Sequence, residues 1–180
     1  MFIKLCSKDF LFLRLIFRKP LKRAAVLDLR GLVEDLVLIG SGVSGSVWRG
    51  RYQNLDVAVK KSHAPTFAAQ MEQMDEIKLL AGLPPHPHVL GLLGAYLEDG
   101  AVCSVTPFMP GGSLEARMRD LTASWLDDPA QITAIMLGLF NGMGHLHAHG
   151  VLHRDGNFSL VFAWFFSIFY YNYMSALFIF

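Results

Sequence analysis

Residues 40–47 read Gly40-Ser41-Gly42-Val43-Ser44-Gly45-Ser46-Val47, with three glycines at the spacing G-x-G-x-x-G and a valine two positions after the last glycine. The apolar run Leu36–Ile39 precedes this stretch, and a second short strand-like run, Ser46–Trp48, begins within it. Glycine is required where backbone amides approach phosphate oxygens closely and where φ is positive. The stretch therefore predicts a phosphate-binding turn between two strands.

The glycine spacing by itself leaves two interpretations open. The same spacing marks the dinucleotide-binding turn of βαβ folds, which continues into a helix. Here an apolar strand with Trp48 and Arg49 follows, and no acidic residue lies at a convincing ribose-binding position. The pattern therefore favours a strand, a turn and a second strand.

Three further apolar runs read as short strands, because turn residues separate them. They are Val57–Val59, Val89–Tyr96 and Ala101–Pro107. Together with the two strands around the glycine turn, they predict an antiparallel meander of five strands.

A helix is predicted between the third and fourth strands. Residues 66–83 carry apolar side chains at three- and four-residue spacing, which is typical of a helix that buries one face. These side chains are Phe67, Met71, Met74, Ile77, Leu80 and Leu83. Pro84-Pro85-His86-Pro87 ends the helix, because proline lacks an amide donor and biases the preceding residue away from helix.

The second half of the chain reads as helical. Pro110-Gly111-Gly112 predicts a flexible connection, and Ser113 is a candidate N-cap with Glu115 nearby. Residues 129–149 read as a second, longer helix.

Charge and cysteine content limit the classes of function. The formal net charge of +1 gives no broad basic surface for nucleic acid. Cys6 and Cys103 lie far apart and outside any C-x-x-C spacing, so free thiols and a cytoplasmic location are expected. Four of the 14 phenylalanines lie in residues 1–19 and seven in residues 156–180, so both ends differ in composition from the middle.

Lys60 ends the apolar strand Val57-Ala58-Val59. A lysine at the end of a strand is, taken alone, usually an ordinary exposed residue. It occurs here with the glycine turn before it, a helix containing Glu76 ahead of His86-Pro87, and His153-Arg154-Asp155 further on. In order and approximate spacing these features resemble the protein kinase family over roughly residues 32–155.

The resemblance implies a role for each of these residues. The three glycines would cover the phosphates of ATP, Lys60 would bind the α- and β-phosphates, and Glu76 would orient Lys60 through an ion pair. Glu72 is the rival for the helix glutamate, but the residues around Glu76 match the family's helix better. The adenine site would consist of Val47, Ala58, Thr106 as gatekeeper, and backbone groups of Pro107 and Met109 in the hinge.

Asp155 would, by the same resemblance, orient and deprotonate the substrate hydroxyl. Without the family, the histidines of this region suggest a metal site, since some of them share a helix face. They are His145, His147, His149 and His153. The family accounts for His147 and His153 without a metal, and no cysteine or acidic ligand clusters beside them, so no metal site is predicted.

The family pattern stops after Asp155. The family expects an asparagine five positions later and then the D-F-G and A-P-E motifs, but position 160 is Leu160 and no Asp or Glu follows Asp155. The magnesium ligands of the family therefore have no candidates. Residues 156–180 contain no charged side chain and are long enough for a membrane span, but their aromatic residues are scattered and do not form belts, which disfavours an anchor.

We therefore expect an α+β, protein-kinase-like fold of the tyrosine-kinase-like group. Residues 1–31 are interpreted as an unstructured or misassigned extension, residues 32–155 as a partial kinase domain, and residues 156–180 as an aromatic tail. The partial domain divides into a complete five-stranded small lobe with one helix to about residue 107, a hinge at 107–112, and a truncated helical large lobe.

The expected function is ATP-dependent phosphoryl transfer to hydroxyl groups of protein substrates, in a truncated chain that binds ATP but is impaired or inactive. The alternative is a non-catalytic, pseudokinase-like module that binds a nucleotide or a partner. Membrane tethering through residues 156–180 is a variant of either, and a membrane location is not favoured.

Overall fold

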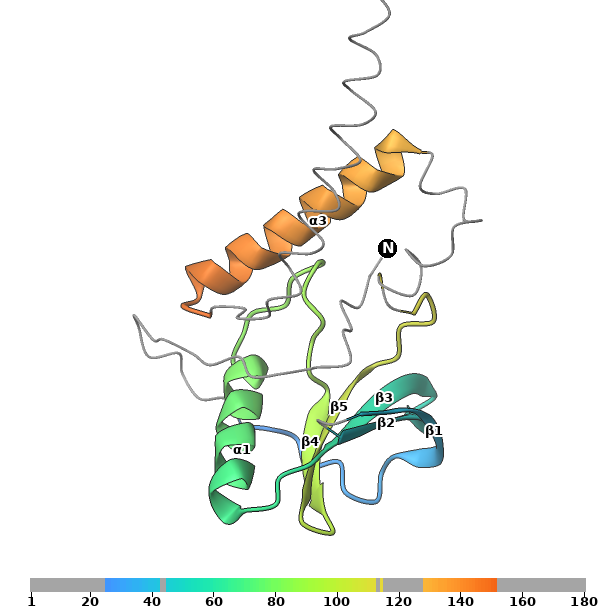
Figure 1. Ribbon diagram of the computed structural model, residues 1–180, viewed down its shortest axis with the longest axis vertical. Helices are drawn as coiled ribbons and strands as arrows, with labels where there is room; N and C mark the ends of the chain where they lie inside the picture. The colour runs from blue at the N-terminus through green and yellow to red at the C-terminus, as the bar shows by residue number, and fades with distance from the viewer. Residues whose placement is uncertain (1–24, 43–44, 113, 115–127, 152–180) are drawn as a thin grey trace, which may run out of the picture.

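The computed structural model describes residues 25–42, 45–112, 114 and 128–151. They form a five-stranded antiparallel sheet, one helix beside it and a second, longer helix (Figure 1). The elements in chain order are β1 (Glu34–Gly42), β2 (Gly45–Tyr52), β3 (Leu55–Ser62), α1 (Phe67–Ala81), β4 (Gly94–Glu98), β5 (Ala101–Pro107) and α3 (Pro129–Ala148). The predicted α+β arrangement, five strands with one inserted helix and a helical part after them, is confirmed. The predicted cap residues Ser113 and Glu115 lie outside the described residues.

The strands lie in the order β1-β2-β3-β5-β4, and each neighbouring pair is antiparallel. The turn Gln53-Asn54 joins β2 to β3 with positive φ angles of 46° and 64°. Such a turn has the twist that suits a two-residue hairpin. Because β3 pairs with β2 on one side and β5 on the other, its residues are held at the centre of the sheet.

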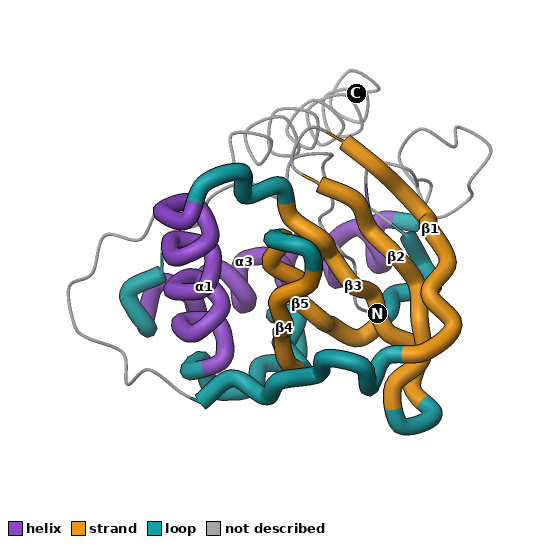
Figure 2. The backbone as a smooth tube through the Cα atoms, turned by 90° about the horizontal axis from the view of Figure 1, so that it is seen from below, coloured by secondary structure: helices purple, strands orange, loops and turns teal. Residues whose placement is uncertain are grey.

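The two faces of the sheet carry different contacts, because successive strand residues point to opposite sides. The apolar cluster on one face consists of Leu29, Val57, Val59, Tyr96, Cys103 and Val105. Burial raises the pKa of the Cys103 thiol to about 11, so the thiol stays protonated at neutral pH. On the other face, Ile77 of α1 packs on Ala95 and Val102, and Figure 2 shows α1 beside the β4 and β5 end of the sheet.

Residues 25–31, which the sequence prediction assigns to the N-terminal extension, pack on the β4 edge of the sheet. Ala95 N donates to Leu27 O at 2.9 Å, and Leu29 N donates to Ala95 O at 3.3 Å. The Leu29 side chain is fully buried in the cluster formed by β3 and β5. Burying a leucine side chain contributes roughly 1.5–3 kcal/mol, so this segment stabilises the sheet.

Helix α1 begins at Thr66, whose Oγ1 accepts a hydrogen bond from Ala69 N at 3.2 Å. The apolar spacing places Phe67 and Met71 on the buried face, and this prediction is wrong: they are 77% and 43% exposed. The part of α1 that packs on the sheet lies in its second half, around Ile77. Regular spacing predicts the helix, but the extent of the sheet beneath it determines how much of the apolar stripe is buried.

Strand β4 begins at Gly94, later than the predicted start at Val89. Val89 N donates to His86 O at 3.1 Å, and the Val89 side chain packs near Leu146 of α3. These contacts hold the segment before β4 against the second helix. It reaches the sheet at Leu93, whose N–H donates to Val105 O at 2.8 Å, and the strand itself begins at Gly94.

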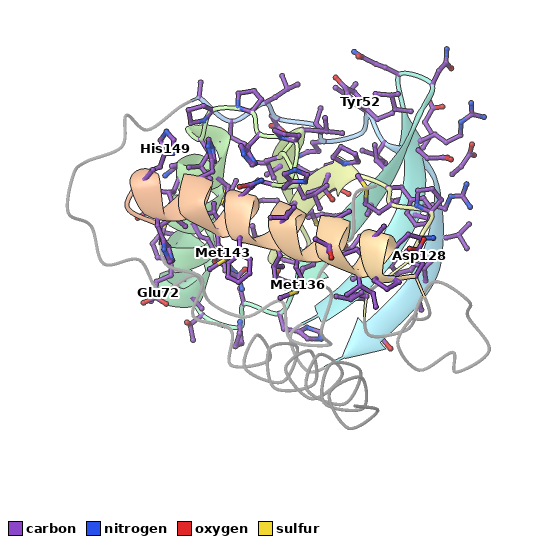
Figure 3. The ribbon with its side chains drawn as sticks, turned by 90° about the horizontal axis from the view of Figure 1, so that it is seen from above. Tyr52, Glu72, Asp128, Met136, Met143 and His149 are labelled. Atoms are coloured by element: carbon purple, nitrogen blue, oxygen red, sulfur yellow. The ribbon has the colours of Figure 1, made fainter. Side chains whose placement is uncertain are left out.

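Helix α3 begins at Asp128, whose carboxylate accepts hydrogen bonds from the side chain of Gln131 and the backbone N–H of Ala130, both at 2.9 Å. These bonds lower the pKa of Asp128. Pro129 suits the first turn, where no amide donor is needed. Figure 3 shows Asp128 and His149 at opposite ends of the helix. Neither α3 nor any other helix of the described residues combines the length and apolarity that crossing a membrane requires.

Candidate functional site

Four of the predicted site residues lie on one face of the sheet. Val47 of β2 is opposite Lys60 of β3, and Ala58 of β3 is opposite Thr106 of β5. Directly opposed residues in an antiparallel pair point to the same face. Ala58 and Lys60 alternate with the fully buried valines of β3, so this face is the one opposite the main apolar cluster. The sheet therefore brings together two apolar side chains, a hydroxyl and a lysine.

The glycine turn joins β1 to β2 at the edge of this face. Gly42 is opposite Gly45, and residues 43 and 44 lie outside the described residues. At Gly45 φ is +139°, and a Cβ there would lie 2.1 Å from the carbonyl oxygen of Lys61. Glycine is therefore required by both the backbone angle and the close approach of β3. A Cβ at Gly40 would meet nothing within 4 Å, which leaves room for a ligand beside this backbone.

Helix α1 packs on the face of the sheet that carries Lys60. Val102 of β5 lies on this face and packs on Ile77 of α1. Glu76, the neighbour of Ile77, is partly buried, whereas Glu72 is exposed. This difference in burial favours Glu76 over Glu72 as the residue that α1 presents toward Lys60.

The predicted hinge follows β5. Pro107 is the last residue of the strand and offers a ligand only its carbonyl, since proline has no N–H. Phe108 N donates to Asp56 O at 2.9 Å, which extends the pairing with β3 by one residue. Gly112 N then donates to Met109 O at 3.2 Å and closes a turn. The hinge therefore begins directly beside the face that carries Ala58 and Thr106.

A stack of histidine rings lies where α3 meets the loop after α1; the shared helix face of His145 and His149 was visible in the sequence, but the contact with His86 was not. The rings of His86 and His145 stack with centroids 4.6 Å apart, and those of His145 and His149 lie 4.4 Å apart. His145 Nε2 donates to Pro84 O at 3.0 Å. Among the residues described, no group of three or more His, Cys, Asp or Glu side chains is arranged to hold a metal ion. The stack therefore joins two segments by ring contacts.

A second unpredicted set of contacts connects the sheet to the hinge. The Arg49 guanidinium lies over the Phe108 ring, 4.7 Å from its centroid, and its Nη2 is 2.9 Å from Asp56 Oδ2. These residues come from β2, β3 and the hinge, and nothing in their sequence spacing indicates the contact.

The predicted base, Asp155, lies outside the described residues, as does His153, so the role of Asp155 stays a prediction.

Comparison with known proteins gives a family for this arrangement. The family described as "Protein tyrosine and serine/threonine kinase" matches residues 33–157. The "Probable serine/threonine-protein kinase mkcC" of Dictyostelium discoideum is 29% identical over 130 residues, covering 71% of this chain and 14% of that protein. "Ephrin type-A receptor 1" of Homo sapiens is 32% identical over 134 residues, 72% of this chain and 13% of that protein. "Serine/threonine-protein kinase STE20" of Saccharomyces cerevisiae is 31% identical over 124 residues, which cover 67% of this chain and 13% of that protein.

This chain belongs to the protein kinase family, because the family match covers most of its length. It spans only 13–14% of the length of these three relatives. Protein kinases use ATP with magnesium. The open backbone at Gly40 and the lysine on the adjacent sheet face fit a polyphosphate. Magnesium requires oxygen ligands, and Leu160, at the position where the family expects asparagine, offers none, so this position does not fit magnesium.

Proposed function

We propose that this chain binds ATP on the sheet face formed by Val47, Ala58, Lys60 and Thr106. The observation that carries the proposal is the strand register, which sets Val47 opposite Lys60 and Ala58 opposite Thr106 beside the glycine turn. The side chains of Val47 and Ala58 offer the adenine ring an apolar surface, and Lys60 offers the phosphates a positive charge. The hinge carbonyls and amides from Pro107 onward lie at the adenine end.

The proposed activity of the parent enzyme is transfer of a phosphoryl group from ATP to hydroxyl groups of proteins, with Asp155 as the base. Membership of the family and similarity to proteins named as serine/threonine kinases support this activity. We assign the chain to the tyrosine-kinase-like group, in line with a family description that covers both tyrosine and serine/threonine kinases. Phosphoamino-acid analysis of a phosphorylated substrate distinguishes the two specificities.

The second candidate function is a non-catalytic nucleotide-binding module. The absence of any Asp or Glu after Asp155 favours it, together with Leu160 at the position where the family expects asparagine. We propose that the family pattern breaks off near residue 155, that residues 156–180 are not a specific membrane anchor, and that the protein is cytoplasmic. Sequencing the transcript across codon 155 tests whether the family pattern breaks off there. Carbonate-resistant membrane retention that is lost on deleting residues 156–180 would contradict both the absence of a membrane anchor in these residues and the cytoplasmic location.

The ATP site is tested by comparing two adjacent lysines in the full 180-residue chain. Lys60→Ala should weaken ATP binding at least tenfold in isothermal titration calorimetry, because it removes a charge close to the phosphates. Lys61→Ala is the matched control, since Lys61 points to the other face, where it pairs with Glu98 and lies 5.2 Å from the Trp48 ring centroid. Equal ATP affinity in both variants would show that the assigned face is wrong.

A further inference from the structure

The position of the hinge depends on one backbone hydrogen bond and the side chains around it. β3 and β5 pair as far as Val57 and Pro107, and Phe108 N then donates to Asp56 O at 2.9 Å. After this bond the chain leaves the sheet and turns at Met109. Where Phe108 is held therefore determines where the backbone of Met109 lies relative to the sheet face.

Arg49 contacts both residues of that hydrogen bond. Its Nη2 lies 2.9 Å from Asp56 Oδ2, and its guanidinium carbon lies 4.7 Å from the centroid of the Phe108 ring. Asp56 therefore bonds the hinge through its carbonyl and the arginine through its carboxylate. A planar guanidinium suits this arrangement, because its edge binds a carboxylate while its face covers an aromatic ring.

The strand register places Arg49 beside the candidate adenine site. Arg49 is opposite Ala58, and it lies two residues from Val47 on the same strand and the same face. The arginine, the aspartate and the hinge phenylalanine thus form a bridge from β2 across β3 to the hinge. About half of each charged side chain is exposed, so the bridge lies at the surface of the protein.

We propose that Arg49 is a positioning residue for adenine recognition, acting through Phe108 to fix the hinge backbone. This inference rests on the proposed function, since it assumes that adenine binds between the sheet face and the hinge. Arg49 need not touch the nucleotide. Its loss lets the Phe108 ring and the adjacent Met109 backbone move, so the hinge groups that meet the adenine edge are no longer held in place.

The inference predicts the same loss of affinity for ATP and for adenosine, because the hinge meets only the base. In the full chain, Arg49→Met should weaken both ligands by the same factor, roughly three- to tenfold, as expected for one exposed ion pair and one cation–π contact. Phe108→Leu should weaken both similarly, whereas Phe108→Tyr, which keeps the ring, should retain the original affinity. The double variant Arg49→Met/Phe108→Leu should bind no more weakly than the worse single variant, since both remove the same bridge.

Arg30→Met is the control, because Arg30 is exposed, loses the same charge and lies outside the bridge. It should leave both affinities unchanged. A loss for ATP without a loss for adenosine would indicate direct contact of Arg49 with the phosphates, and additive losses in the double variant would show that the two residues act separately. Either result overturns the inference, as does an unchanged affinity in Arg49→Met. If the original chain binds ATP in a Lys60-dependent manner while Arg49→Met has no effect, only this inference fails; if the original chain binds neither ligand, the proposed function fails with it.

Discussion

At the scale of single residues, the glycine turn shows why one missing side chain matters. A Cβ at Gly45 would collide with the Lys61 carbonyl, and the φ angle of +139° is unfavourable for any other residue. The β-strand that carries Lys60 therefore lies as close to the turn as backbone contact allows. In the proposed ATP site, this closeness would let Lys60 and the turn bind the phosphates of one ligand.

Gly45→Ala should lower the free energy of unfolding by roughly 1–3 kcal/mol, because either the turn or β3 must shift. It should also weaken ATP binding, since the shift separates the turn from Lys60. Gly40→Ala is the control for the unfolding measurement, as a Cβ there meets no protein atom within 4 Å. Urea unfolding and calorimetry measure the two effects, and equal unfolding free energies for the two variants would contradict the packing described at Gly45.

At the scale of elements, α3 and the loop after α1 are joined by close backbone approach. A Cβ at Gly142 would lie 2.8 Å from the His88 carbonyl oxygen, and one at Gly138 would lie 3.0 Å from His88 Nδ1. Glycine inside a helix normally costs stability relative to alanine. Its presence at both positions is explained by the space that the His88 loop needs.

Two substitutions in the same helix should therefore have opposite effects. Gly142→Ala should destabilise the protein by about 1–3 kcal/mol, because the new methyl group meets backbone that cannot move aside easily. Gly144→Ala should stabilise it by about 0.5–1 kcal/mol, because a Cβ there meets nothing within 4 Å. Thermal or urea unfolding gives both values. Stabilisation by both substitutions would mean that α3 does not approach the loop as described.

The histidine stack at the same junction should make stability depend on pH. Partial burial and the neighbouring rings of His145 and His88 lower the pKa of His86. His86 Nδ1 also accepts a hydrogen bond from His88 N at 3.2 Å, which requires this nitrogen to be unprotonated. Since the unfolded chain takes up this proton at a higher pH than the folded chain, the free energy of unfolding should fall as the pH drops below about 6.5.

Urea unfolding between pH 7.5 and 5 measures this dependence. His86→Gln should flatten the decrease, because it removes the group whose pKa differs between the two states. His63→Gln is the control, as His63 is exposed and outside the stack. If His86→Gln leaves the decrease unchanged, the ring contacts do not control the titration.

At the scale of the whole molecule, the proposed ATP site and the sequence after Asp155 together predict nucleotide binding without efficient catalysis. Phosphoryl transfer relies on magnesium ions and fixed positive groups that neutralise the transferred charge. Lys60 supplies part of this, but residues 156–180 contain neither a carboxylate nor the expected asparagine. The full chain should therefore show no magnesium-dependent phosphorylation of a generic protein substrate above background. Robust activity that Asp155→Asn abolishes would contradict this prediction.

The parts of the fold that the sequence predicts are those that local patterns determine. The apolar run Val57-Ala58-Val59 correctly indicated a strand, because turn residues bound a short apolar run there. The prediction that the apolar stripe on α1 is buried was wrong at Phe67, since burial depends on where the sheet ends. The contact of His86 with His145 and the bridge from Arg49 to Phe108 could not be predicted, because each joins residues distant in the chain whose types serve many other purposes.

The segment around Leu29 has a consequence for how the protein behaves outside its folded context. β4 is the last strand of the sheet, and the main-chain groups of Ala95 are paired with this segment instead of being left open. An unprotected strand edge is a template on which other chains can add, which leads to aggregation. A shortened protein that begins at residue 32 would therefore expose this edge and leave a leucine-sized hole beneath it, so recombinant production should start before residue 25.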